Sequence, residues 1–134
     1  MRHIFVNVAV KNLAASMAFF KAMGFEFNMQ FTNETAACLI IEENIHAMLL
    51  TERYFKTFTP KPLVDAKQST EILIALSCDS RAHVDDLVAK AVAAGGRVVR
   101  EPNDHGFMYD QAFEDLDGHI WELCYMDMAA LRQE

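Results

Sequence analysis

The sequence repeats one order of secondary-structure patterns, and this repeat constrains the fold more than any single segment does. Ile4–Val10 alternates its apolar side chains like a half-buried strand, and an amphipathic helix follows, capped by Asn12 and stopped at Gly24. Three short strands separated by turn-prone residues are predicted next, at Phe25–Phe31, Ala36–Ile41 and Ile45–Leu50. The first half of the chain therefore predicts the order βαβββ.

The second half repeats this order after a connector that contains two prolines. Ile72–Cys78 alternates like the first strand, and Ser80 can cap a second amphipathic helix that ends at Gly95-Gly96. The last two strands are joined through the turn signal Asp117-Gly118. The three strands predicted after the helix are Arg97–Glu101, Phe107–Phe113 and His119–Tyr125.

Each predicted module has one helix, which can cover only one face of its sheet. Two modules packed side by side give an α+β fold: two paired βαβββ modules that form a curved eight-stranded mixed sheet, with the helices outside and a cavity inside. We expect a single domain over 1–134. Its parts are module one at about 1–52, a connector at about 53–69, module two at about 70–126 and a short C-terminal helix at about 127–133.

Composition excludes several classes of protein. A chain of 134 residues, 52% hydrophobic and 23% charged, can bury one globular core. Its apolar runs are far shorter than the roughly 20 residues of a membrane helix, and its first residues lack a signal-peptide pattern. The three cysteines lie in apolar runs without C-x-x-C spacing, which predicts buried thiols and a cytoplasmic location. A net charge of −7 argues against nucleic acid as a partner.

Two segments resemble a known superfamily. V-A-V-K-N-L-A-A-S-M-A-F-F-K-A-M-G-F, at Val8–Phe25, is similar to the opening strand and helix of vicinal oxygen chelate proteins, and F-E-D-L-D-G-H-I-W-E-L, at Phe113–Leu123, is similar to their closing hairpin. This superfamily includes glyoxalases, bleomycin-resistance proteins and extradiol dioxygenases. The resemblance covers nearly the whole chain and implies the fold described above. It leaves the reaction open, because the scaffold serves isomerisation, oxygenation, epoxide opening and drug sequestration.

The resemblance also implies where a metal would bind. Enzymes of that superfamily hold a divalent ion with four inward-facing His or Glu ligands, one from the first and one from the last strand of each module. The matching positions of this chain are Phe5, Leu50 (or Thr51 in a register shifted by one), Leu73 and Glu122. Three of the four lack a donor, so we predict no metal of the family type and no other cofactor.

A shifted metal site that uses His46, His105 or His119 is the alternative, because histidine is the commonest transition-metal ligand. His119 and Glu122 are three residues apart in a predicted strand and point to opposite faces, which argues against their sharing one ion.

Strand alternation predicts which side chains face the cavity. Glu122 is the candidate catalytic residue, as an acid–base group or a hydrogen-bond anchor, and the alternative is a carboxylate satisfied by Asn7, Ser77 or water. His46 either faces inward or is a surface histidine near a hairpin. The predicted ligand-binding residues are Phe5, Asn7, His46, Met48, Leu50, Leu73, Ser77 and Glu122, with Ala9 and Ala75 beside them.

Two functions follow from these features. The first is a metal-free binding protein of the bleomycin-resistance type, a homodimer that holds a small, partly apolar molecule. The alternative is a lyase or isomerase resembling lactoylglutathione lyase, with a shifted metal or with Glu122 as the acid–base group. The aromatic connector Tyr54–Pro62 is predicted to be either a lid over the cavity or a dimer contact.

Overall fold

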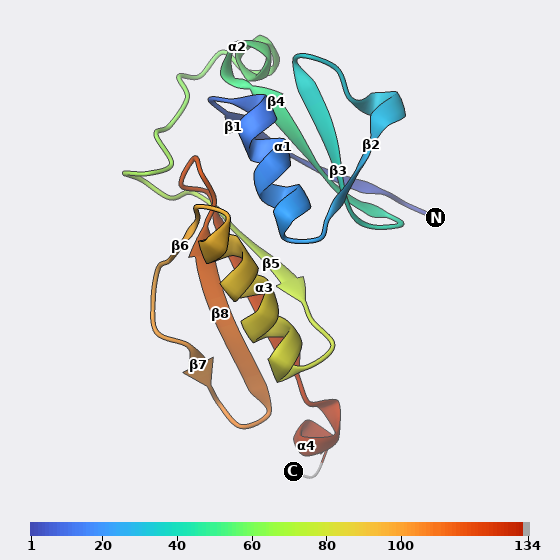
Figure 1. Ribbon diagram of the computed structural model, residues 1–134, viewed down its shortest axis with the longest axis vertical. Helices are drawn as coiled ribbons and strands as arrows, with labels where there is room; N and C mark the ends of the chain where they lie inside the picture. The colour runs from blue at the N-terminus through green and yellow to red at the C-terminus, as the bar shows by residue number, and fades with distance from the viewer. Residues whose placement is uncertain (133–134) are drawn as a thin grey trace. The chain divides into compact units, whose positions relative to one another are not determined.

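The computed structural model describes residues 1–132 and divides the chain into two compact units, Met1–Asp65 and a second that begins at Ala66. The division falls inside the predicted connector at 53–69. Each unit contains one sheet and one long helix that packs against the sheet (Figure 1). The predicted α+β class and the two βαβββ modules are confirmed.

The first unit contains a sheet of four strands in the order β1-β4-β3-β2. β1 runs parallel to β4, and the other neighbours are antiparallel. Its elements are β1 (Ile4–Val10), α1 (Leu13–Ala22), β2 (Glu26–Asn28), the 3-10 helix η1 (Met29–Phe31), β3 (Ala36–Glu42), β4 (Ile45–Thr51), α2 (Glu52–Phe55) and the 3-10 helix η2 (Lys56–Phe58).

The second unit contains a sheet with the order β5-β9-β8-β6, and the short strand β7 pairs with β8. β5 runs parallel to β9, as β1 does to β4, and the remaining pairs are antiparallel. Its elements are β5 (Leu73–Ser77), α3 (Arg81–Ala93), β6 (Arg97–Val98), β7 (Asn103–Asp104), β8 (Met108–Glu114), β9 (Ile120–Met126) and α4 (Met128–Arg132).

The sequence signals at the ends of the helices act as expected. Asn12 Oδ1 accepts a hydrogen bond from the Ala15 N–H at 3.0 Å, and Ser80 Oγ accepts one from the His83 N–H at 3.0 Å. Both bonds satisfy donors that the first turn of a helix leaves unpaired. Gly24, with φ of +100°, turns the chain out of α1 in a conformation that residues with a Cβ rarely adopt.

Three strands differ from the sequence prediction. The strand predicted at Phe25–Phe31 ends at Asn28, because the Asn28 side chain accepts from the Gln30 N–H at 3.0 Å and starts η1 instead. The strand predicted at Arg97–Glu101 ends at Val98. β7 was not predicted, and it brings the described sheets to four and five strands.

Two predicted segments without strands also have defined structure. The connector forms α2 and η2, where the rings of Tyr54 and Phe58 meet edge to face with 5.1 Å between centroids. The predicted C-terminal helix at 127–133 is α4, and residue 133 lies outside the described residues. None of the helices within residues 1–132 has the length and apolar character needed to cross a membrane.

The core of the first unit lies between α1 and one face of its sheet. Val8 and Val10 of β1 are buried, as are Leu39 and Leu49 on β3 and β4. Across from them, α1 buries Leu13, Ser16, Phe19 and Phe20. Because successive side chains of a strand point to opposite faces, burying this face leaves Phe5 and Asn7 on the other one.

Leu49→Ala tests this core. Leu49 is fully buried, so the variant should lower the free energy of unfolding by about 2–5 kcal/mol, through lost burial and the cavity left behind. Denaturant unfolding followed by circular dichroism measures the change. Val64→Ala, at an exposed position of the same unit, is the control and should change stability by no more than about 0.5 kcal/mol. Equal effects in both variants would contradict the assigned core.

The core of the second unit lies between α3 and the face of its sheet that carries Phe113, Trp121 and Leu123. Trp121 Nε1 donates to Asp115 Oδ2 at 3.0 Å, and Asp115 Oδ1 accepts from the N–H groups of Asp117 and His119. Burial raises the pKa of Asp115 despite these bonds. Asp115 therefore organises the turn between β8 and β9 from inside the core.

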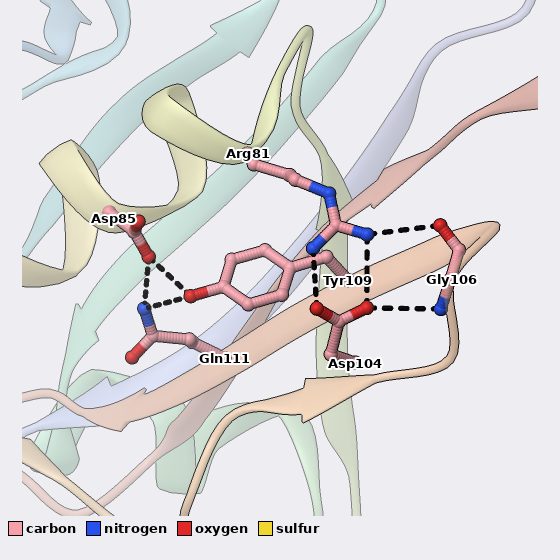
Figure 2. A network of polar contacts seen from close by, with 6 residues as sticks. All are labelled: Arg81, Asp85, Asp104, Gly106, Tyr109 and Gln111. Atoms are coloured by element: carbon pink, nitrogen blue, oxygen red, sulfur yellow. Dashed lines mark hydrogen bonds and ion pairs between the residues drawn. The ribbon is translucent and has the colours of Figure 1, made fainter.

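A polar network fastens the β7–β8 turn to α3 (Figure 2). Arg81 donates to both oxygens of Asp104, at 2.7 and 2.9 Å, and to the Gly106 carbonyl at 3.0 Å. Its guanidinium lies over the Tyr109 ring, 5.0 Å from the centroid. Asp85 of α3 accepts from the Tyr109 hydroxyl and the Gln111 amide, so β8 is linked to the helix at two places.

This network makes stability depend on pH. The hydrogen bonds from Arg81 and the Gly106 N–H lower the pKa of Asp104 to about 2, below its value in the unfolded chain. A lowered carboxylate pKa stabilises the folded state above about pH 4, and that contribution disappears as pH falls toward about 2. Asp104→Asn should therefore lower the melting temperature at pH 7, and its difference from wild type should shrink toward zero near pH 2.

The matched control is Asp86→Asn, which removes a surface carboxylate from the Lys90 ion pair on α3. This variant should differ little from wild type at either pH. A wild-type advantage over Asp104→Asn that persists unchanged at pH 2 would contradict the role assigned to Asp104.

Candidate functional site

One face of the first sheet lies opposite α1, and we call it the first open face. The parallel register of β1 and β4 pairs Phe5 with His46, Asn7 with Met48 and Ala9 with Leu50. Paired residues of neighbouring strands point to the same face. The structure thus brings together, on the first open face, the residues predicted there from unit one: Phe5, Asn7, His46, Met48 and Leu50.

His46 is the least expected member of this face. Its ring stacks on Phe5, with 4.7 Å between centroids and 13° between planes, and the ring of His3 lies 5.6 Å away on a similar plane. His46 is only 8% exposed, whereas Phe5 is 53% exposed. The alternative of a surface histidine is therefore wrong. The Nδ1 atom of His46 is buried without a hydrogen-bond partner among residues 1–132.

A buried nitrogen without a partner is uncommon, because its lost hydration costs about 1–3 kcal/mol when no bond replaces it. Neutral imidazole offers one donor and one acceptor nitrogen. The first open face therefore holds an unused hydrogen-bonding atom below an exposed aromatic ring.

The second sheet has an equivalent face, opposite α3, which we call the second open face. β5 pairs with β9 so that Ala75 is beside Glu122 and Ser77 beside Cys124, while Leu73 is 52% exposed at the start of the strand. On the other side of β9, Ala112 pairs with Glu122 and Asp110 with Cys124. Leu73, Ser77 and Glu122 share this face, as predicted from alternation.

Glu122 is paired with a residue that the sequence analysis missed. Nη2 of Arg100 lies 3.1 Å from Glu122 Oε2 and 2.7 Å from Asp110 Oδ1. The three side chains are partly buried, at 31% exposure for Arg100, 28% for Glu122 and 13% for Asp110. Asn7, Ser77 or water were the expected partners of Glu122, and the structure supplies a guanidinium instead.

Arg100 reaches this face because β6 is short. In a strand extended to Glu101, Arg100 would share a face with Val98, whose partner Phe113 points toward α3. The ladder instead ends near the bond from the Val99 N–H to the Ala112 carbonyl, at 3.4 Å, and the chain then leaves the strand. The alternation rule therefore could not have placed Arg100. The hairpin register around Asp117-Gly118 could have placed Asp110 diagonally beside Glu122.

The cysteines are free thiols. Cys38 and Cys78 are buried and Cys124 is half-buried. Burial raises the pKa of Cys78 to about 11, with smaller contributions from Cys124 and Asp79. A protonated thiol is a weak nucleophile and a weak metal ligand, so these residues suit packing better than chemistry.

Comparison with known proteins identifies the family of the chain. The model of the Glyoxalase/Bleomycin resistance protein/Dioxygenase superfamily matches residues 2–123. The chain belongs to this superfamily. No curated protein matches the chain.

Solved structures of other proteins share the fold. A hypothetical protein from S. aureus is 29% identical, with 93% of this chain and 94% of that chain covered and a TM-score of 0.79. A glyoxalase/bleomycin resistance protein/dioxygenase family enzyme from Burkholderia phytofirmans PsJN is 17% identical over 91% and 96%, with a TM-score of 0.75. A fosfomycin resistance protein from Listeria monocytogenes is 21% identical over 93% and 89%, with a TM-score of 0.65.

The residues at the superfamily's metal positions do not fit a metal ion. Phe5 and Leu73 present exposed hydrocarbon on their open faces, and Leu50 pairs with Ala9 on the first one. Thr51, the position in the shifted register, uses its hydroxyl to accept from the Tyr54 N–H at 3.3 Å. The residue at the remaining position, Glu122, forms an ion pair with Arg100. At an effective dielectric constant of about 20, two unit charges about 4 Å apart repel by roughly 4 kcal/mol, and a divalent ion would double that.

The histidines considered for a shifted site do not assemble one within the described part of the chain. Residues 1–132 contain no group of three or more His, Cys, Asp or Glu side chains placed to hold a metal ion. His46 belongs to the first unit, where its ring stacks with those of Phe5 and His3, whereas His105 and His119 belong to the second.

Proposed function

We propose that this protein binds a small, partly apolar molecule on its open faces without a metal ion. The observation that carries the proposal is the buried, unpartnered Nδ1 of His46 below the exposed ring of Phe5. Small-molecule sites combine mostly apolar surface with a few polar atoms that fix the orientation of the ligand. A ligand that displaces the stacked rings of Phe5 and His3 would uncover His46 Nδ1 and supply the missing partner.

The accessible apolar part of the first open face comes from two side chains. Phe5 offers an exposed aromatic ring and Met48 is half-buried on the same face, whereas Leu50 and Cys38 there are buried. Methionine adapts its shape to different ligands because its chain is unbranched and flexible. On the second open face, Leu73 and Ala75 are exposed apolar side chains.

Each open face also carries polar groups that can anchor a ligand. The Asn7 amide has no hydrogen-bond partner among the described residues, and it provides both donors and an acceptor. Ser77 adds an exposed hydroxyl on the second open face, next to the pair of Glu122 and Arg100. These groups can orient a carbonyl, amide or hydroxyl of the ligand.

A binding or sequestration role agrees with part of what the superfamily's name covers, and one similar structure is that of a fosfomycin resistance protein. We propose a homodimer, on the family resemblance alone. We also propose a cytoplasmic location, which the free thiols support because a reducing compartment keeps cysteines unpaired.

An enzyme is the alternative, as a lyase or isomerase resembling lactoylglutathione lyase. Glu122 is the candidate acid–base group, and its Oε2 accepts a hydrogen bond from Arg100 at 3.1 Å. Metal content and turnover separate this alternative from the binding protein.

The binding proposal is tested by thermal shift. A panel of small aromatic and aliphatic carbonyl and amide compounds is screened against the full chain in the presence of EDTA. At least one compound should raise the melting temperature in a concentration-dependent way, since ligands stabilise the state that binds them. Phe5→Ala should weaken the binding of that compound by about tenfold, the effect of removing one well-packed aromatic contact.

Phe31→Ala removes a similarly exposed aromatic ring from η1, outside β1 and β4, and should leave the affinity unchanged. A panel that gives no shift, or a shift abolished equally by both variants, would contradict the assigned face.

Metal content provides the second test. The purified protein should contain far less than one equivalent of nickel, zinc, manganese or iron by elemental analysis, because only one of the four family positions carries a donor. Lactoylglutathione lyase activity should remain at the level of buffer after nickel or zinc is added. Stoichiometric metal together with turnover would replace the binding proposal with the enzyme.

A further inference from the structure

The guanidinium of Arg100 lies against Glu122, the position at which the family resemblance implies a metal ligand. One nitrogen, Nη2, contacts both Glu122 Oε2 and Asp110 Oδ1. The two carboxylates come from adjacent strands, β9 and β8, and are diagonal neighbours on the second open face. The guanidinium thus links two negatively charged side chains of this face.

Arg100 is held firmly in its charged form. Partial burial alone would lower its pKa, but the hydrogen bonds to Asp110 and Glu122 outweigh burial, and the pKa of Arg100 is raised above its already high ordinary value. Its Nε atom has no hydrogen-bond partner within residues 1–132, and Nη1 makes only a long contact, 3.4 Å, to the Glu101 carbonyl. Donors therefore remain for a bound molecule.

We propose that Arg100 is a resident cation that replaces the superfamily's metal ion in the second unit: it neutralises Glu122 and Asp110, keeps divalent ions away from Glu122, and directs its remaining N–H groups at an oxygen of the ligand. This role rests on the proposed function, since it assumes a ligand on the second open face. A guanidinium donates hydrogen bonds in fixed directions but cannot take an oxygen into a coordination shell.

The local charge narrows the ligand class. Arg100 carries one positive charge, and Asp110 and Glu122 carry two negative charges, so the cluster is negative overall. A carboxylate or phosphate would be repelled by the two carboxylates, which leaves a neutral oxygen as the best acceptor. The ligand class is therefore a partly apolar molecule with a carbonyl, amide or hydroxyl oxygen.

Manganese binding to the full chain tests the role of Arg100, because Mn²⁺ accepts carboxylate ligands. Electron paramagnetic resonance measures the concentration of unbound Mn²⁺. Arg100→Met keeps most of the side-chain length and removes the charge. This variant should bind Mn²⁺ at least about tenfold more tightly than wild type, since the two carboxylates lose their cation. Adding Glu122→Gln to Arg100→Met should return the affinity to the wild-type level.

Arg97→Met is the matched control. Arg97 also pairs with a carboxylate of β8, Glu114, but its side chain is 75% exposed and does not contact Glu122. This variant should bind Mn²⁺ no better than wild type. A folded Arg100→Met protein without increased affinity, or wild-type binding of Mn²⁺ that Glu122→Gln abolishes, would overturn the proposal.

A second measurement keeps Arg100 in place and applies if Arg100→Met does not fold. Glu122→Gln should lower the melting temperature because Arg100 loses a charged partner, and EDTA should leave the wild-type melting temperature unchanged. A fall of the wild-type value in EDTA to that of Glu122→Gln would assign Glu122 to a metal and overturn the proposal. If ligand-induced shifts persist while the manganese result fails, only the role of Arg100 is wrong; if no ligand shifts the protein, the proposed function is wrong.

Discussion

Each unit has one long helix and a sheet with two faces, so the helix covers only one face of the sheet. The rest of the structure depends on this constraint. Burying a leucine- or phenylalanine-sized side chain contributes about 1.5–3 kcal/mol, so the face beneath the helix takes the large aliphatic and aromatic residues, such as Leu49 beneath α1 and Trp121 beneath α3. The opposite face can then carry side chains with other tasks. Phe5 and Leu73, both more than half exposed, occupy equivalent places at the start of the first strand of each module.

Alternation along strands made a large part of this predictable. Whether a side chain points toward the helix or away from it depends only on its neighbours along the strand, so single residues such as Asn7, Leu73 and Glu122 could be placed from the sequence. Capping residues set the starts of α1 and α3 for the same reason, since Asn12 and Ser80 bond to N–H groups three residues away. Strand alternation and helix caps thus predicted the repeated βαβββ order, and that order predicted the fold.

The partners of these residues were not predictable in the same way. The environment of His46 depends on Phe5 and His3, which reach it across a parallel pairing some forty positions away in the chain. The partner of Glu122 depends on where β6 ends, because Arg100 gains access to the second open face only after the chain leaves the sheet. Asn28 similarly ended β2 through a side-chain bond that competes with the ladder.

Three of the four positions at which the resemblance implies a metal ligand carry hydrocarbon side chains, and the fourth, Glu122, pairs with Arg100. We propose that these two features belong together. A carboxylate kept on a partly buried face without a counter-charge is costly, and Phe5, Leu50 and Leu73, at the other positions that the resemblance implies, offer no donor to a metal ion. Arg100 supplies the missing charge from within the chain and satisfies Asp110 as well. A metal would polarise an oxygen and lower the pKa of bound water, whereas a guanidinium binds and orients an oxygen without activating water. In the role proposed for Arg100, the second open face recognises a molecule rather than transforming it.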